Sequence, residues 1–427
     1  MSDLLSFLEA SPTAHHGTRE VARLLLAAGG VELSPGNWEL PVGEIRFFRR
    51  GTGLIGAIRR GRGKLLESGC RVAVAHTDSP SLQLKIRGVK SSGALRSAPV
   101  EVYGSPILST WLDRPLEVAG TVAVESAGGI ELIPVRSRRG MGVIPNLAIH
   151  LNRKVNEGYA YDTQTQMRPL LDATVLERGL LEELCSLEGV DPRKVVDSEL
   201  YLVPAEPPTS WGEGDRGFFT ASRIDNLAGV WANLQGFLQA EPGEATQILL
   251  FFDHEEIGSL SRSGARSPWL HSILRRLTEG EGEGALDLLS SRSLLLSNDA
   301  THGNHPNFPE KLDPDYLPEL SGGPAIKLSA VRRYATEPEA TAMLRLIARE
   351  AEVDLQLIQN RADHPAGTTV GPMSSSSTLL PTVDFGIPIL GMHSARETAH
   401  LADIDATCRL MRGLFESSVP ARLRSYR

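Results

Sequence analysis

Residues 245–259 read ATQILLFFDHEEIGS, an apolar run that ends in four ionisable side chains. The run has the length and the composition of a buried strand. A strand that ends in this way presents its carboxylates at the carboxyl edge of a sheet, where α/β enzymes hold their ligands. We therefore predict a buried strand of an α/β domain with functional side chains at its end. A solvated acidic loop is the alternative that this segment alone leaves open.

The adjacent carboxylates Glu255 and Glu256 limit the chemistry at the end of this strand. Two buried carboxylates repel each other unless a counter-charge lies nearby. A metal cation supplies that charge, because one carboxylate can then ligate the ion while the other accepts a proton. The pair therefore indicates a metal-assisted reaction.

Length and composition are those of an ordinary globular protein with two domains. At 427 residues the chain exceeds what one hydrophobic core usually sustains. Its 41% hydrophobic and 22% charged residues are typical of soluble proteins. The net charge of −8 argues against a non-specific nucleic-acid binder, because such binding depends on Lys and Arg neutralising phosphates.

The cysteines and the N-terminal residues indicate a cytoplasmic protein. Cys70, Cys185 and Cys408 form no C-x-x-C pair, so we expect three reduced thiols rather than disulfides or a thiolate zinc site. The N-terminal residues lack the basic and apolar regions of a signal peptide, and no apolar run is long enough to cross a membrane. We expect a cytoplasmic location and no membrane partner.

Hydrophobic periodicity predicts alternating helices and strands on either side of a different middle region. Before that region we expect helices at 4–10 and 18–28 and strands at 45–49, 54–59 and 71–75. After it we expect helices at 227–238, 267–277 and 343–350 and strands at 245–252, 294–296 and 387–390.

The middle region has short β runs separated by Gly, Pro and Ser, at 100–103, 116–124 and 130–135, with one helical pattern at 173–187. Renewed strand–helix alternation after such a stretch usually marks one domain inserted in a loop of another. We therefore predict a mostly β insert at 89–211, within an α/β domain formed by residues 1–88 and 212–427.

Several apolar runs end in side chains that can ligate a metal ion. These are His76, Glu255 with Glu256, Asp299 and His393, and a helix start supplies Asp225. A simple N-cap is the alternative for Asp225. Oxygen and imidazole donors at separate strand ends indicate one shared metal centre, and zinc accepts both donor types. Three carboxylates and one bridging hydroxide balance two divalent ions, so a two-metal hydrolytic site is the simplest prediction.

Spaced motifs carry a resemblance to a known family. HTDSP at 76–80, SRIDNLAG at 222–229, DHEEIGS at 253–259, SNDATHGNHPNF at 297–308 and GMHSARE at 391–397 resemble the signature blocks of the M18 metallo-aminopeptidases, the aspartyl aminopeptidase family. NLAIHLNR at 146–153 and PAIKLSAVRRYAT at 324–336 are similar to further blocks. The resemblance implies a zinc-exopeptidase-type α/β/α domain with a mostly β inserted dimerisation domain.

The resemblance also implies roles for the candidate residues. Two zinc ions would be bridged by Asp225, with His76 and Asp299 on one ion and Glu256 and His393 on the other. Glu255 would be the general base that takes a proton from a metal-bridging water and delivers it to the leaving amine. Asp78 would hold the second N–H of the His76 imidazole. A turn aspartate is the alternative for Asp78.

Two further residues would act on the substrate, a peptide with a free N-terminus. By resemblance, His150 would reach into the active site of a neighbouring subunit of a homo-oligomer, with a tetrahedral dodecamer as the family's form. A satisfied histidine on an apolar strand is the alternative. Lys327 would provide the cation that an N-terminal Asp or Glu requires, unless it extends from a strand edge into water. Arg332, Arg333 and Arg396 are weaker candidates.

Two departures from the family pattern leave the side-chain preference open. Ala366 occupies a place where family members commonly have Cys, and VRRYAT at 331–336 replaces the more usual NQRYAT. A related two-metal amidohydrolase, such as a deacylase or carboxypeptidase, is the nearest alternative. An inactive metal-binding scaffold is the other, but such a scaffold has no need of a base like Glu255 beside its ligands.

Overall fold

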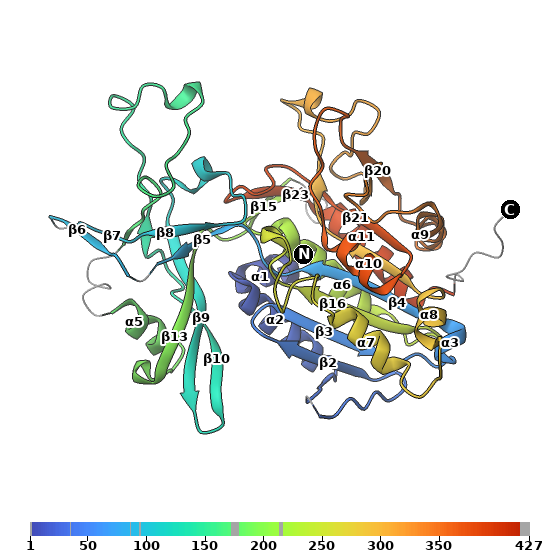
Figure 1. Cartoon of the computed structure of the whole chain (residues 1–427). Helices are drawn as coiled ribbons and strands as arrows, with labels where there is room; N and C mark the ends of the chain where they lie inside the picture. The colour runs from blue at the N-terminus through green and yellow to red at the C-terminus, as the bar shows by residue number, and fades with distance from the viewer. Residues whose placement is uncertain are drawn as a thin grey trace.

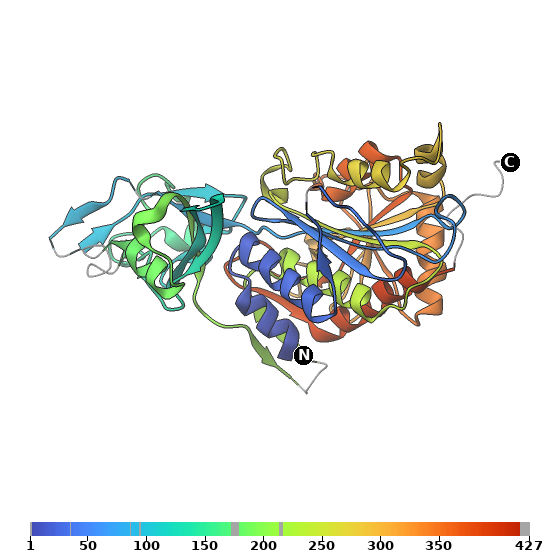
Figure 2. The ribbon, with the colours of Figure 1, turned by 90° about the horizontal axis from the view of Figure 1, so that it is seen from below.

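Two large β-sheets lie side by side in the chain, each with its own hydrophobic core (Figures 1 and 2). The computed structural model describes residues 2–34, 36–85, 87–93, 95–171, 179–212 and 217–418. The larger part is an α/β body that contains both ends of the described chain. The smaller part is mostly β and comes from the middle of the chain.

The α/β body is built on a nine-stranded sheet. Its strands, in spatial order, are β1 (Val31–Glu32), β2 (Ile45–Arg50), β3 (Leu54–Arg59), β16 (Thr246–Phe252), β4 (Cys70–His76), β17 (Leu294–Asn298), β21 (Thr382–Gly386), β19 (Ala325–Leu328) and β20 (Gln356–Gln359). The strand predicted at 245–252 is thus central, and it is buried along its whole length.

Side chains of β16 alternate between two hydrophobic cores, as a strand covered on both faces requires. Leu249 and Phe251 join one core, whereas Leu250 and Phe252 join the other. The first core includes α1 (Ser2–Ala10), α2 (Ala14–Ala27), α6 (Ile224–Gln239), α9 (Pro338–Glu350) and α11 (Leu401–Glu416). The second includes α7 (Trp269–Leu277), α8 (Ala285–Ser290) and α10 (Val370–Thr378). The predicted α/β/α architecture is confirmed (Figure 2).

Strand register brings the expected ligands to one edge of this sheet. β16 and β4 are parallel, with Phe252 paired to His76. β17 runs parallel to β4 on its other side and ends just before Asp299. Because parallel strands end at the same edge, the segments that follow β4, β16 and β17 emerge beside one another.

The second sheet has its own strand order. Its strands are β6 (Lys90–Ser92), β7 (Leu95–Ser97), β12 (Leu170–Leu171), β11 (Gly142–Val143), β9 (Leu116–Ser126), β13 (Val195–Pro204), β5 (Ser81–Leu84) and β8 (Val100–Tyr103), with β10 (Gly129–Arg136) paired to β9. Helix α5 (Leu180–Leu187) packs near β10. Residues 173–178 of the helix predicted at 173–187 lie outside the described residues.

Smaller elements complete the chain. They are α3 (Leu65–Ser68), the 3-10 turns η1 (Leu108–Trp111), η2 (Val155–Glu157), η3 (Pro192–Lys194), η5 (Glu255–Ile257) and η6 (Pro309–Lys311), and the strands β14 (Thr209–Trp211), β15 (Phe218–Ala221), β18 (Thr301–His302), β22 (Pro388–Ile389) and β23 (Glu397–His400). β14, β15 and β23 form a three-stranded sheet.

Some sequence predictions differ from the structure in their bounds. The run at 387–390 forms the short strand β22, which pairs with β18 in a separate two-stranded sheet. The helix predicted at 343–350 begins at Pro338. The helix predicted at 18–28 begins at Ala14, where the Thr13 hydroxyl lies 2.8 Å from Nδ1 of His16 and holds the first turn.

The three cysteines are free thiols, as expected, and Cys70 and Cys185 are buried. Within the described ranges, none of the helices has both the length and the apolar character that crossing a membrane demands.

Replacement of Leu250 by Ala tests the central position of β16. Leu250 is 0% exposed, so the cavity left behind should lower the free energy of unfolding by about 2–5 kcal/mol in urea denaturation. The matched control is Leu26→Ala on α2, where the leucine is 55% exposed. Equal losses in the two variants would contradict the buried central position.

Candidate metal centre

The expected ligands come from loops at the carboxyl edge of the main sheet. His76 is the last residue of β4, and Glu255 and Glu256 lie in turn η5 just after β16. His254 lies between the end of β16 and turn η5. Its φ of 61° turns the chain sharply away from the strand. Asp225 lies at the start of α6 and Asp299 follows β17.

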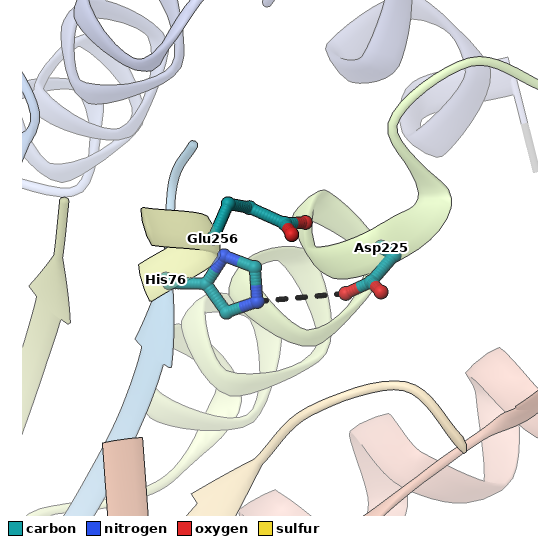
Figure 3. Close-up of side chains that lie close together, drawn as sticks. All are labelled: His76, Asp225 and Glu256. Atoms are coloured by element: carbon teal, nitrogen blue, oxygen red, sulfur yellow. Dashed lines mark ion pairs between the residues drawn. The ribbon is translucent and has the colours of Figure 1, made fainter. Parts of the chain in front are cut away.

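His76, Asp225 and Glu256 form the tightest group (Figure 3). Their ligand atoms all lie within 4.8 Å of one another, and Nε2 of His76 is 3.5 Å from Oδ1 of Asp225. An imidazole and two carboxylates at this spacing are a suitable donor set for zinc.

His393 approaches the same group from the opposite side of Asp225. Its Nε2 is 3.6 Å from Oδ2 of Asp225 and 3.3 Å from Oε2 of Glu256. Asp225 therefore faces one imidazole with each carboxylate oxygen. This is the arrangement that a carboxylate bridging two cations requires.

Asp299 lines the same pocket, which has a volume of about 330 Å³. Its Oδ1 lies 3.4 Å from the Lys327 ammonium. All five predicted ligands line this pocket, but Asp299 and His393 are not part of the group whose ligand atoms all lie within 4.8 Å of one another.

Burial and mutual repulsion dominate the electrostatics of the site. Burial raises the pKa of Glu256 well above its usual value, and the negative charge of Asp225 raises it further. Burial and neighbouring carboxylates raise the pKa of Glu255 to about 8. Burial alone would lower the pKa of His76, but its bonds to Asp225 and Asp78 raise it well above the usual value. Such a cluster is stabilised by positive charge.

Two buried oxygens in the group lack a hydrogen-bond donor. They are Oδ1 of Asp225 and Oε1 of Glu256, and neither is accessible to solvent. Oδ1 of Asp225 has only the 3.5 Å ion pair with His76, and a buried carboxylate oxygen that lacks a hydrogen bond is costly because it has lost its water. The donor set and these oxygens fit a divalent cation.

Asp78 lies behind His76 rather than among the donors. Nδ1 of His76 donates to the carbonyl oxygen of Asp78 at 3.0 Å and lies 3.4 Å from its carboxylate. The carboxylate accepts the backbone N–H groups of Glu255 at 3.0 Å and Glu256 at 3.2 Å. It also accepts the hydroxyl of Tyr103 at 2.7 Å. Asp78 therefore connects the first strand end to the second.

Glu397 is a site residue that the sequence reasoning missed. It is 2% exposed, and its carboxylate accepts the backbone N–H of Asp225 at 3.0 Å and of His393 at 2.9 Å. Glu397 thus joins the segments that carry two candidate ligands. The signal was present, because Glu397 is the last residue of the motif GMHSARE.

Lys327 lies in the pocket on strand β19 and is 4% exposed. Its ammonium is 5.5 Å from the centre of the Tyr334 ring. Burial alone would lower the pKa of Lys327, but Asp299 and other anionic neighbours raise it, so the side chain is charged. The strand-edge alternative, with the ammonium in water, is not what the structure shows.

The other proposed substrate residues lie elsewhere. His150 is exposed in the loop after β11 and does not line this pocket. Arg396 donates to the carbonyls of Pro207 and Thr220, so it holds the chain segment that returns from the second sheet. Arg332 lies 3.7 Å from Glu337 at the surface.

Comparisons with known proteins identify the family. The family described as Aminopeptidase I zinc metalloprotease (M18) matches residues 7–415. A probable M18 family aminopeptidase 2 of Pseudomonas aeruginosa is 38% identical over 422 residues, covering 97% of each chain. A protein of the same name from Clostridium novyi is 34% identical over 413 residues, covering 94% of this chain and 95% of the relative.

Solved structures share the whole fold. The structure of an Ape4 and Nbr1 complex matches with a TM-score of 0.92 and 31% identity, over 97% of this chain and 85% of that one. The S. cerevisiae mApe1 dodecamer matches with a TM-score of 0.84 and 25% identity, over 97% and 95%. Among the alternatives that the sequence left open, these relatives support the aminopeptidase. The chain belongs to the M18 family of zinc metallo-aminopeptidases.

Proposed function

We propose that this metallo-aminopeptidase removes acidic residues, Asp or Glu, from the N-termini of peptides with the help of two zinc ions. The observation that carries the proposal is the placement of Asp225 between the imidazoles of His76 and His393, with the buried ammonium of Lys327 in the same pocket. The first feature supports two cations and the second supports an anionic side chain on the substrate.

The proposed ligand set contains three carboxylates and two imidazoles. Asp225 would bridge the ions, with His76 and Asp299 on one side and Glu256 and His393 on the other. When bound, the ions would lower the pKa of a water molecule and polarise the scissile carbonyl. Asp78 would keep Nδ1 of His76 protonated, so that Nε2 is free to ligate.

Glu255 would move the proton. Its Oε2 is 4.0 Å from Nε2 of His76, and its side chain is 12% exposed, so it lies beside the ligands and can still meet a substrate. Burial raises the pKa of Glu255, which makes its carboxylate a better proton acceptor than an exposed one. Glu255 would accept the proton of the attacking water and pass it to the leaving amine.

Lys327 would recognise the side chain of the first residue. A buried ammonium at 3.4 Å from Asp299 has two N–H groups left for other acceptors. A substrate carboxylate in the pocket would share this charge with Asp299. A neutral side chain would leave those donors without acceptors, which is the usual origin of strong discrimination.

The second sheet would form the inserted domain and contribute to self-association. Strand β5 starts at Ser81, and β14 pairs with β15 of the α/β body. We therefore propose an insert at residues 81–204, which starts and ends earlier than the range 89–211 expected from the sequence. A cytoplasmic location stays a prediction from the sequence.

The loop that carries His150 would contact a neighbouring subunit. Three apolar side chains beside His150 are exposed to solvent: Leu147 at 58%, Ile149 at 48% and Leu151 at 74%. Apolar groups concentrated in this way usually mark a protein interface. The yeast relative is a dodecamer, and a homo-oligomer such as a tetrahedral dodecamer would bring His150 to an active site other than its own.

Replacing Glu255 with Gln tests the proposed base. The amide keeps the size of the side chain but cannot accept the proton, so kcat should fall by about 10²–10⁴-fold while metal analysis finds the wild-type zinc content. Glu281→Gln on an exposed loop is the matched control. Unchanged peptide hydrolysis in Glu255→Gln would show that another group is the base.

Dipeptides that differ only in the first residue test the role of Lys327. Wild-type protein should favour Asp and Glu over Ala and Leu and lose all turnover in chelator. In Lys327→Met the ratio of kcat/KM for acidic over neutral substrates should fall by about 10- to 100-fold, since a hydrogen bond to a charged group is worth about 1.5–3 kcal/mol.

The control for that series is Lys194→Met on η3 of the insert, where the lysine is exposed. Zinc content is measured in each variant, because Lys327 also pairs with Asp299. If wild-type protein cleaves neutral residues as well as acidic ones, Lys327 does not select the substrate.

Mixed oligomers test whether His150 acts on a neighbour. His150→Ala and Glu255→Gln subunits should each be nearly inactive alone. Co-expressed and randomly mixed, they should recover roughly a quarter of wild-type activity, because some sites then combine an intact Glu255 with an intact His150 from the neighbour. The same two proteins purified separately and combined without exchange are the control. No recovery after verified co-assembly would assign His150 to its own subunit or to no site.

A further inference from the structure

The segment Tyr103–Gly104–Ser105 leaves the second sheet at the end of strand β8 and passes behind the metal centre. The hydroxyl of Tyr103 contacts Asp78, the turn at Gly104 passes close to Glu256, and the carbonyl of Ser105 contacts His393. None of the three residues is a candidate ligand. Their contacts show that the second sheet does more than pack against the α/β body.

Tyr103 acts on the side of His76. Its hydroxyl donates to Oδ2 of Asp78 at 2.7 Å, and Oδ1 of the same carboxylate lies 3.4 Å from Nδ1 of His76. The Tyr103 ring packs edge-on against Tyr201 of β13, at 5.7 Å between ring centres, so the hydroxyl is aimed by the second sheet. The hydrogen bond therefore fixes the carboxylate that in turn faces the imidazole.

Ser105 acts on the side of His393. Nδ1 of His393 donates to the carbonyl oxygen of Ser105 at 3.1 Å, and the N–H of Ile107 donates to the carbonyl of His393 at 2.9 Å. His393 has a φ of 66°, so its backbone conformation is one that few side chains adopt unaided. These two bonds hold the residue in place and direct its Nε2 toward Asp225.

Gly104 allows the segment to pass close to the ligands. Its φ is +72°, and a Cβ there would lie 3.3 Å from Cβ of Glu256 and 3.4 Å from Cα of Pro80. A larger residue would be strained by its backbone and crowded by Glu256. The turn therefore allows Tyr103 to contact Asp78, which lies behind His76, while Ser105 contacts His393.

We infer that this segment positions both histidine ligands, and that Tyr103 is a positioning residue whose hydroxyl sets metal affinity through Asp78. The inference rests on the proposed ligand set. Ser105 holds Nδ1 of His393 directly. Nδ1 of His76 donates to the carbonyl of Asp78, whose carboxylate Tyr103 holds, so both Nε2 atoms are left for the ions. Groups behind a ligand typically change metal affinity by about 10- to 100-fold. Docking of the insert thus completes the metal centre.

Tyr103→Phe tests this inference, because it removes the hydroxyl and keeps the ring against Tyr201. Zinc retention is measured by metal analysis across a chelator titration, without reference to activity. We expect zinc to be lost at a chelator concentration about 10- to 100-fold lower than in wild type. The value of kcat should fall and KM should stay nearly unchanged. Wild-type zinc retention in Tyr103→Phe would overturn the inference.

Tyr201→Phe is the matched control. It removes the hydroxyl of the neighbouring ring, whose partner is Glu199 within the second sheet. Zinc retention should equal that of wild type. If Tyr201→Phe loses zinc as readily as Tyr103→Phe, general packing of the insert is responsible and the assignment to the Tyr103 hydroxyl is wrong.

A double variant shows whether Tyr103 acts through Asp78. If it does, Asp78→Asn combined with Tyr103→Phe should lose no more zinc affinity than Asp78→Asn alone, whereas independent effects would add. His76→Ala tests the ligand set separately from the positioning role of Tyr103. If His76→Ala keeps full zinc content, the ligand set itself is wrong, and if only the Tyr103 results fail, the ligand set stands without the positioning role.

Discussion

Repulsion between buried carboxylates is the constraint on which this structure depends. Asp225, Glu256 and Asp299 lie in one pocket at the edge of the main sheet, with Glu255 beside them. Like charges in a place that excludes water are unstable unless cations or N–H donors compensate. The surroundings supply such donors: backbone N–H groups point at Asp78 and Glu397, and the ammonium of Lys327 lies beside Asp299.

The two sheets contribute different groups to this pocket. The α/β body provides every candidate ligand. Strands β4, β16 and β17 end at a common edge, and the start of α6 and the loop after β22 bring Asp225 and His393 to it. The second sheet provides contacts from behind, through the turn that follows β8. The second sheet therefore meets the pocket at both histidines, directly at His393 and through Asp78 at His76.

Local patterns predicted the fold well where the pattern itself determines the structure. Strand β16 follows from its continuous apolar run, and helix α6 follows from apolar side chains at helical spacing. The run at 387–390 does contain a short strand, but apolar composition did not reveal that it would join β18 rather than the main sheet. Glu397 was missed although it ends the motif GMHSARE, because the motif does not reveal that its carboxylate accepts two backbone N–H groups.

The sequence by itself determined the donor types, the family and the buried strand β16, because motifs and apolar runs are properties of consecutive residues. The tertiary structure alone decided that each oxygen of Asp225 faces a different imidazole, and that Tyr103 and Ser105 stand behind those imidazoles. Ser105 and His393 are 288 positions apart in the chain. Contacts at such separations follow from strand register and domain docking, which place atoms to within a few tenths of an ångström and which no local pattern encodes.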